Sequence, residues 1–574
     1  MLRKHLLGFL SVLVAASLLA SACTTTKKPP ANNNQGNTTT PPSGQAGKPA
    51  PGGEIVFDVP DDPDTFAPFW LTSAYAADVT DRVYGGGLIK IGFDYKPAPD
   101  LAEDLPTISA DNKTYTFKVR KGIKFTDGKP VTAADFEFTY NLLLSPDYAG
   151  PYKSTVKDID SVKALDEYTF EITLKAPFAP FLFGGASVHP VAKHLLQDVP
   201  VKDMAAWDGW KNPVGAGPWK FVEWKSGQYT LLERNPDYWE LNKAGAAEGV
   251  VGPWAERLRI RVIPEENTAM AALEAGELSF RDSVEPAHVD RLKKDFADRL
   301  VSFDWNRMGY GYQMFNNDLW PTNIKEVRQA LSYGLNRDQI IKGVMDNKAT
   351  LPTGFIPPIH WAYDKTLKGY NYDVKKATEL LESAGFKKNA DGIYEKDGKP
   401  LKLTYVGTKG SSIVEGIALQ SQKDWKEIGI AVDLVMVDFN TLLEKHMKPG
   451  DFHVTFSGLG FTIDPHYSFD GSFHSSNILL DAKGINAGSN RARYKNAKVD
   501  QLIDQGKVTT DMNERLKIYQ EAQKLIMDDA PANYIYVNLW TDFAKKEIKG
   551  IVNWDGYGIN TAQYMSQWYL NTAK

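Results

Sequence analysis

Cysteine is almost absent from this sequence, since Cys23 is the only one among its 574 residues. The chain after Cys23 therefore has neither a disulfide framework nor a thiolate metal site. Long apolar runs are scarce too. The one long uncharged run, Leu6 to Ala22, stands near the N-terminus, and no later segment approaches the roughly 20 apolar residues of a spanning helix. These absences predict an exported soluble body behind a short N-terminal leader.

Catalytic motifs are missing as well. The sequence contains no G-x-S-x-G, no H-E-x-x-H, no phosphate loop and no G-x-G-x-x-G that opens a helix. The run Gly85 to Gly87 lacks the Lys and Ser/Thr of a phosphate loop, and it predicts a tight turn or a close backbone approach. Carboxylate pairs for glycoside hydrolysis come from distant elements, so that alternative stays open, although no feature points to it. We expect a protein that is not an enzyme.

Metal and nucleic-acid binding also lack support. The spacings of His453, His466 and His474 fit no short ligand pattern, so we expect no metal and no cofactor. The chain carries 66 Lys and Arg against 71 Asp and Glu, and this mild acidity argues against a nucleic-acid partner. Aromatic residues make up 12% of the chain, which fits either a large core or a cleft lined with amphipathic rings.

The N-terminus has the layout of a secretory signal peptide over residues 1–22, with basic Arg3 and Lys4 before the apolar run. Ala20, Ser21 and Ala22 stand directly before Cys23, and the segment resembles a bacterial lipobox, in which the cysteine is acylated. An uncleaved anchor helix and an ordinary signal with an incidental cysteine are the alternatives. Residues 23–53 lack large apolar residues and predict a disordered tether. The long tether favours the outer face of a one-membrane cell over a periplasm.

The remaining chain, about 520 residues, is long enough for two or three domains. Alternating apolar residues predict half-buried strands at 115–119, 168–174 and 258–262. Apolar stripes and end signals predict helices at 323–334, 373–386 and 413–428, the last followed by a strand at 431–439. The mixture indicates an α/β chain with more than one sheet.

The segment 98–138 carries a series of ordered motif residues: Pro99, Leu101, Ala102, Glu103, Tyr115, Thr116, Phe117, Arg120, Gly122, Phe125, Asp127, Gly128, Thr132, Ala133 and Asp135. Further motifs stand at 215–219, 234–239, 327–331 and 372–386. Together they resemble the extracellular solute-binding proteins of peptide-type ABC importers, the dipeptide- and oligopeptide-binding family 5. The resemblance covers essentially the whole body.

This resemblance implies a class II periplasmic-binding-protein-like α/β fold, with two main lobes, a hinge and an inserted extra domain. By motif position, domain I comprises 54–88, 213–308 and 540–574. Domain II is 89–212 and domain III is 309–539. In such a fold the ligand lies between the lobes and closure buries it.

The resemblance also implies a function, which is the capture of oligopeptides for delivery to a membrane permease and its ATPase subunits. The protein is expected to act as a monomer that the N-terminal lipid holds at the cell membrane. Members that grip a peptide's amino terminus often use an aspartate, and here Phe461 stands at that position, or Thr462 after a slip of one residue, and neither is acidic. Asp464 could take the place of that aspartate. The alternative interpretation of Asp464 is a structural one, in which Asp464 and Pro465 form a turn. An oligosaccharide is therefore the alternative ligand.

Candidate ligand-binding residues follow from the same motif positions. Thr72, Ser73 and Ala74 occupy the domain I segment whose backbone pairs with ligand in family members. Tyr310 lies in the first strand of the opposing lobe. Thr408 and Lys409 lie where relatives place a cation for the ligand's carboxylate. The other candidates are Phe461, Asp464, Tyr536 and Asn538, and Cys23 is the lipidation site.

Overall fold

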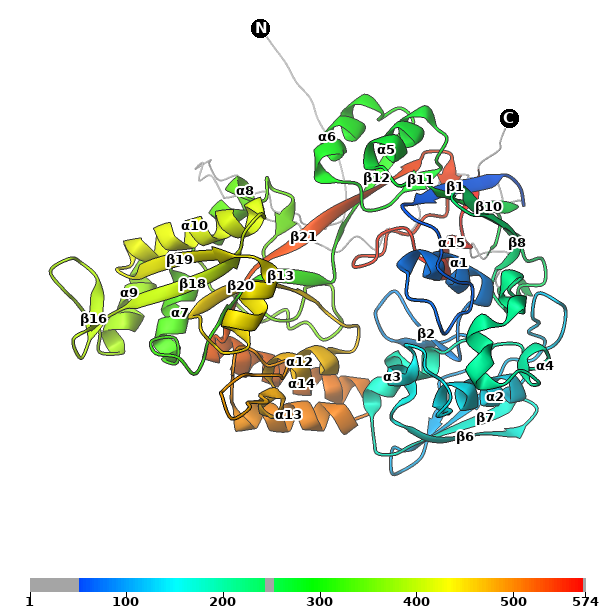
Figure 1. Cartoon of the computed structure of the whole chain (residues 1–574), viewed down its shortest axis with the longest axis horizontal. Helices are drawn as coiled ribbons and strands as arrows, with labels where there is room; N and C mark the ends of the chain where they lie inside the picture. The colour runs from blue at the N-terminus through cyan, green and yellow to red at the C-terminus, as the bar shows by residue number, and fades with distance from the viewer. Residues whose placement is uncertain (1–50, 243–251, 571–574) are drawn as a thin grey trace, which may run out of the picture. The chain divides into compact units, whose positions relative to one another are not determined.

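The structure is a computed structural model that describes residues 51–242 and 252–570 (Figure 1). The predicted signal peptide, Cys23 and all but the last three residues of the predicted tether lie outside the described residues. Within those two ranges, no helix combines the length and the apolar character required to cross a bilayer.

The first sheet has four strands in the order β1-β10-β9-β8. Their bounds are Glu54–Val59 for β1, Arg257–Val262 for β10, Tyr229–Arg234 for β9 and Trp219–Lys225 for β8. β1 runs parallel to β10, and its Ile55 and Phe57 lie opposite Leu258 and Ile260. All four side chains are buried, so the alternating pattern predicted the inward face of β10 correctly.

The second sheet, in the order β4-β5-β7-β6, is antiparallel. Its strands are β4 (Thr107–Ile108), β5 (Thr114–Lys118), β7 (Thr169–Leu174) and β6 (Ile159–Asp166). Tyr115 and Phe117 of β5 are buried, which confirms the strand predicted there. The helix α2 (Ala133–Leu144) packs on this sheet, and its N-terminus is fixed by Asp135, whose carboxylate accepts the N–H and the hydroxyl of Thr132, each at 2.9 Å.

The third sheet has eight strands, six of them in the order β11-β21-β13-β20-β18-β19, with β12 and β14 also paired to β21. The bounds are Phe280–Arg281 (β11), Ala532–Lys545 (β21), Gly309–Phe315 (β13), Val454–Gly460 (β20), Lys402–Thr408 (β18), Ala431–Val437 (β19), Leu300–Asn306 (β12) and Ala349–Thr350 (β14). The three predicted helices are confirmed here as α7 (Lys325–Tyr333), α9 (Val374–Ser383) and α10 (Ser412–Glu427). α10 packs on β18 and β19, and the predicted strand after it is β19.

The long strand β21 links two parts of this sheet (Figure 1). Its first residues pair with β13, and its later residues, from Leu539 to Lys545, pair with β12. β12 continues into β13 through Arg307 and Met308, so the chain passes twice between the two parts at neighbouring places. The predicted domain boundaries at 308/309 and 539/540 fall at this double crossing, and they stay a prediction.

The remaining described helices lie around these sheets. Their bounds are α1 (Ala74–Tyr84), α3 (Lys153–Val156), α4 (Lys193–Leu196), α5 (Glu266–Ala275), α6 (Pro286–Asp295), α8 (Arg337–Gly343), α11 (Phe439–Thr441), α12 (Pro465–Phe473), α13 (Ala497–Val508), α14 (Met512–Asp529) and α15 (Ala562–Met565). Short strands form three small sheets: β2 (Ile89–Ile91) with β3 (Pro97–Pro99), β15 (Lys387–Lys388) with β16 (Tyr394–Lys396) and β17 (Lys399–Pro400), and β22 (Ile548–Lys549) with β23 (Tyr569–Leu570).

Several separate apolar cores hold the elements together. One core joins the first two sheets and includes Trp219 and Trp568, while another lies between the third sheet and helices α7, α9 and α10 and includes Trp425. These three tryptophans are fully buried, so for them the core interpretation is correct. A further core packs α12, α13 and α14 against β13 and β21. Separate cores are what a chain of this length requires.

Candidate ligand-binding site

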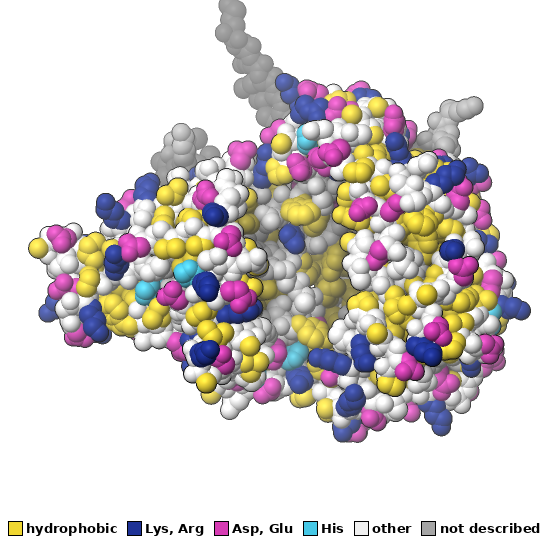
Figure 2. All heavy atoms as spheres, in the orientation of Figure 1, with side chains coloured by type: hydrophobic (Ala, Val, Ile, Leu, Met, Phe, Trp, Pro, Cys, Tyr) yellow, Lys and Arg dark blue, Asp and Glu magenta, His cyan; other side chains and the backbone are white. Residues whose placement is uncertain are grey.

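A cavity of about 570 Å³ lies beside α1 and β2. Residues from the segments 152–189 and 554–562 also line it. Figure 2 shows the surface hollowed beside the part that carries α1 and β2. A volume of this order is typical of sites for small ligands. Its lining residues include Asp81, Lys90, Tyr152, His189, Trp554 and Tyr557.

The run Gly85 to Gly87 forms part of the cavity wall. Each of the three glycines lies so close to a neighbouring residue that a side chain would not fit there. Gly85 has a φ of 75°. A Cβ on Gly86 would lie 1.6 Å from the Oδ2 of Asp100, and one on Gly87 would lie 2.4 Å from the carbonyl carbon of Ser187. Of the two sequence interpretations, a tight turn or a close backbone approach, the close approach is therefore confirmed.

The charges on the cavity wall differ in how they are compensated. Lys90 donates to Glu240 over 3.0 Å and lies 3.5 Å from the Oδ1 of Asp100. Although burial opposes it, these two carboxylates raise the pKa of Lys90 above its usual range. Among the described residues, Asp81 makes no side-chain hydrogen bond or ion pair, and burial raises its pKa to about 6, with Arg82 opposing.

His189 is held between two aromatic rings at the same cavity. Its ring centroid lies 4.9 Å from that of Phe69 and 5.2 Å from that of Tyr84, with nearly parallel planes. The residue is 8% exposed, and its Nε2 has no hydrogen-bond partner among the described residues. Burial lowers its pKa to about 4, so the imidazole is neutral near pH 7 and one of its nitrogens is an acceptor.

An aromatic stack forms another wall. The rings of Trp554 and Tyr557 lie 4.5 Å apart, and the ring of Tyr95 lies 5.3 Å from that of Trp554. The Nε1 of the buried Trp554 has no hydrogen-bond partner in the described part of the chain. The cavity thus combines apolar faces with a few polar groups, the usual composition of a small-ligand site.

The residues predicted from motif position lie elsewhere. None of the ten predicted ligand-binding residues, all of which the structure describes, lines this cavity. The N–H and hydroxyl of Thr72 donate to Asp64, Ser73 is the N-cap of α1, and Ala74 is exposed at the start of that helix.

Three predicted aromatic residues are core residues around the third sheet. The ring of Tyr310 lies 5.2 Å from that of Tyr534, and Phe461 packs 5.3 Å from Phe355. Tyr536 is 8% exposed and stacks on Phe456. Tyr310 and Phe461 belong to the same apolar core, and Tyr536 belongs to another. The structure therefore brings Tyr310 and Phe461 together, but neither residue lines the large cavity.

Asp464 has a partner inside the protein. It is the N-cap of α12, where its Oδ1 accepts the N–H of His466 at 2.8 Å. Arg515 donates to both of its carboxylate oxygens, at 2.7 and 3.0 Å. The two side chains are 0% and 1% exposed. Both oxygens of the carboxylate that the sequence suggested as the partner of a ligand's amine are therefore already bound by Arg515 in a buried ion pair.

The other three predicted residues lie at strand ends or edges. Thr408 is the last residue of β18, and the exposed Lys409 follows it with its N–H donated to Val437. The half-buried Asn538 pairs with Ala349 of β14. Asn538 lies in β21, whereas Thr408 and Lys409 lie at the end of β18.

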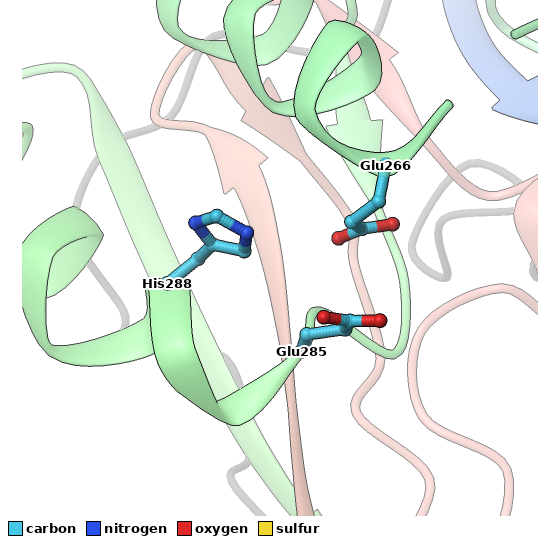
Figure 3. Close-up of side chains that lie close together, drawn as sticks. All are labelled: Glu266, Glu285 and His288. Carbon is cyan, nitrogen blue, oxygen red and sulfur yellow. The ribbon is translucent and has the colours of Figure 1, made fainter.

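A different group of side chains could hold a metal ion. The donor atoms of Glu266, Glu285 and His288 lie within 4.8 Å of one another, and Figure 3 shows the two carboxylates and the imidazole close together. Arg281 ion-pairs with Glu266, and the Nη2 of Arg291 lies 3.5 Å from the Nδ1 of His288. These cations compete with a metal, and none of the three side chains lines the large cavity.

The three histidines considered in the sequence serve separate roles. The ring of His453 bonds the N–H of Thr404 at 2.9 Å and the carbonyl of Trp320 at 3.1 Å. His474 accepts the N–H of Ser476 at 3.1 Å. Within the described residues they do not form a group of metal ligands.

The motif interpretation did not include Asp81, Tyr152 and His189, which line the cavity. They belong to segments far apart in the sequence, and no spacing rule joins them. The one available signal was the run Gly85 to Gly87, which predicted close backbone approach four residues after Asp81.

The fold and the cavity define a class of protein, the two-lobed, mixed α/β binding proteins of the periplasmic-binding-protein kind, as the sequence predicted. The chain belongs to the bacterial extracellular solute-binding proteins, family 5, because a sequence model of that family's middle region matches residues 96–479. The family consists of solute-binding proteins rather than enzymes. Both the predicted family and the predicted fold class are confirmed.

Named relatives extend over most of the chain. The oligopeptide-binding protein AppA of Bacillus subtilis is 32% identical over 508 residues, which are 86% of this chain and 87% of that protein. Its structure in complex with a nonapeptide matches with a TM-score of 0.62 and 30% identity over 91% of this chain and 100% of that one. The periplasmic binding protein DppA of Helicobacter pylori, in complex with the peptide STSA, matches with a TM-score of 0.61 and 26% identity over 91% and 99% of the two chains.

Proposed function

We propose that this protein captures oligopeptides outside the cytoplasm and delivers them to the permease of an ABC importer. The observation that carries the proposal is the match to a peptide-complexed relative over nine-tenths of the chain. The cavity of about 570 Å³ supports this proposal, because its walls combine aromatic rings with a few polar groups, as small-ligand sites do. The relatives described above are named for peptides and give no support to the oligosaccharide alternative.

The proposed mechanism is ligand-driven closure. Domain I (54–88, 213–308 and 540–574) and domain III (309–539) move about the double crossing formed by β12–β13 and β21, with domain II at 89–212. A ligand that touches both lobes only when they are closed favours the closed form by its differential affinity. The closed monomer then docks on the permease, whose ATPase subunits supply the energy of transport.

Anchoring through Cys23 completes the proposal. A diacylated cysteine would hold the protein at the outer face of the cell membrane, because two acyl chains give stable anchoring where one does not. We expect Cys23→Ala to remove the lipid mass from the mature chain and to release the protein from the membrane fraction. A variant that keeps both the mass and the membrane association would contradict anchoring at this residue.

Peptide capture is tested by thermal unfolding of the full chain with nonapeptides of random sequence. Binding to the native state alone adds about 2.7 kcal/mol of stability at 100 times the dissociation constant, so the unfolding midpoint should rise. A mixture of oligosaccharides serves as the comparison. A midpoint that rises only with the oligosaccharides, or with neither mixture, overturns the peptide proposal.

A further inference from the structure

The cavity contains a carboxylate whose charge no described residue compensates as a direct partner. Asp81 lies in the last turn of α1, exposed at the cavity, and makes no side-chain hydrogen bond or ion pair among the described residues. The other cavity charges differ, because Lys90 is matched by Asp100 and Glu240. The cavity therefore has one carboxylate without a cation.

Arg82, the neighbour of Asp81 in the sequence, does not serve as that cation. Its Nη1 bonds the carboxylate of Asp78 at 3.1 Å, and its Nη2 bonds the amide oxygen of Asn560 at 2.6 Å. Arg82 is 1% exposed, whereas Asp81 opens to the cavity. Asp78 adds a second negative charge nearby, and the C-terminal end of α1 adds the negative end of the helix dipole.

Two further residues with polar groups, Tyr152 and His189, line the same cavity. Tyr84, one turn after Asp81 on α1, stacks on His189, whose other face stacks on Phe69. The ring of Tyr152 lies 5.4 Å from Phe69, and burial together with the charge of Asp81 raises the pKa of its hydroxyl. His189 has a buried Nε2 without a partner in the described chain, so a neutral imidazole and a phenol belong to residues that line the same cavity as the carboxylate.

We propose that Asp81 is the counter-ion for a primary ammonium group of the bound peptide, with His189 and Tyr152 as its polar neighbours. A carboxylate, a neutral imidazole and a phenol oxygen all accept hydrogen bonds, and an ammonium group has three N–H donors to satisfy. Asp464, the other candidate carboxylate, already binds Arg515 through both oxygens. The inference rests on the proposed capture of peptides and adds the residue that selects among them.

The ammonium group has two sources, the amino terminus of the peptide and a lysine side chain. Three lysine-controlled nonapeptide mixtures distinguish them: lysine-free with a free amino terminus, lysine-free and N-acetylated, and N-acetylated with one central lysine. Binding of each mixture to the full chain is measured by titration calorimetry for the wild type, Asp81→Asn and Asp81→Glu. Asp295→Asn, an exposed carboxylate at the end of α6, is the matched control.

We expect the wild type to prefer an ammonium-bearing mixture over the N-acetylated lysine-free one by roughly 10- to 100-fold, as charge-assisted hydrogen bonds predict. Asp81→Asn should remove that preference, Asp81→Glu should keep part of it, and Asp295→Asn should keep all of it. The mixture that loses affinity identifies the source of the ammonium group.

Equal wild-type affinity for the three mixtures overturns the inference without any variant, and so does a preference that survives in Asp81→Asn. Either result leaves the proposed function intact, because peptides still bind. If the wild type binds none of the mixtures, the proposed function fails and the inference fails with it. The thermal midpoint of each variant shows whether it is folded, and Asp81→Ser replaces Asp81→Asn if the latter is not.

Discussion

Removal of the charge on Asp464 should destabilise the protein strongly and leave ligand selection unchanged. The carboxylate accepts three hydrogen bonds, two from Arg515 and one from the N–H of His466. Asp464→Asn keeps one oxygen for the N-cap, for which asparagine is as suitable as aspartate. The new amide NH₂ faces an Arg515 N–H, however, and the guanidinium loses its counter-ion.

The magnitude follows from the surroundings of Arg515. The guanidinium is 1% exposed and lies 5.8 Å from the rings of Phe183 and Trp361, so water does not replace the lost carboxylate. Breaking a buried ion pair by removal of one partner costs about 3–5 kcal/mol. In a cooperative unit of 150–250 residues, this loss lowers the unfolding midpoint by roughly 6–20 °C.

The assay is thermal unfolding of the full chain, with Asp433→Asn as the control. Asp433 pairs with Lys402 over 2.7 Å, but both side chains are more than half exposed, so its loss should cost at most about 1 kcal/mol. Arg515→Met combined with Asp464→Asn should cost less than the sum of the two single changes, because the uncompensated charge is then gone.

Two results would refute this reasoning. Equal midpoints for Asp464→Asn and Asp433→Asn would mean that the buried pair does not contribute as its geometry indicates. Loss of the preference for free-amine nonapeptides in a folded Asp464→Asn would mean that Asp464, rather than Asp81, meets the ligand's ammonium group.

Two further predictions concern the cavity wall. Gly87→Ala should lower the thermal midpoint, because the new Cβ would lie within 2.7 Å of backbone atoms of Ser187 and Val188, and overpacking of this kind costs about 1–3 kcal/mol. The control is Gly343→Ala, whose Cβ would have no atom within 4 Å and which should change stability by less than about 0.5 kcal/mol. Equal midpoints for the two variants would contradict the prediction. The affinity for the free-amine mixture should fall as the pH drops from 7 to 5, because Asp81, with a pKa of about 6, becomes protonated and loses its attraction for a cation. The other charged or titratable groups at this site are Asp78, Arg82, Lys90, Asp100, Tyr152, His189, Tyr238 and Tyr557. His189, with a pKa of about 4, stays mostly neutral over this range, and an affinity that does not change in the wild type would exclude an ionised Asp81 as the counter-ion.

The sequence predicted the local elements well because short-range interactions create them. Asp373 caps α9 by accepting the N–H of Lys376 at 2.9 Å, and Gly385 follows the helix with a φ of 87°. The alternation of Leu258 and Ile260 likewise showed which face of β10 is buried. Each signal depends on residues that lie within a few positions of one another.

The role of a particular carboxylate could not be predicted in the same way. Asp464 and Asp81 are equally polar in the sequence, but Asp464 meets Arg515, 51 residues later in the chain, and is buried with it. Asp81 instead meets a cavity that Tyr152 and His189 line from distant segments. The motif positions placed candidates on the correct fold but not at this cavity.

The sequence by itself determined the family, the α/β class and the main helices and strands, because periodicity, end signals and ordered motifs are local properties of the chain. Only the tertiary structure decided which polar groups are paired and which remain open to a ligand. That decision depends on long-range packing. It places Arg515 against one aspartate and leaves another beside an aromatic cavity, without an ion-pair partner among the residues that the structure describes.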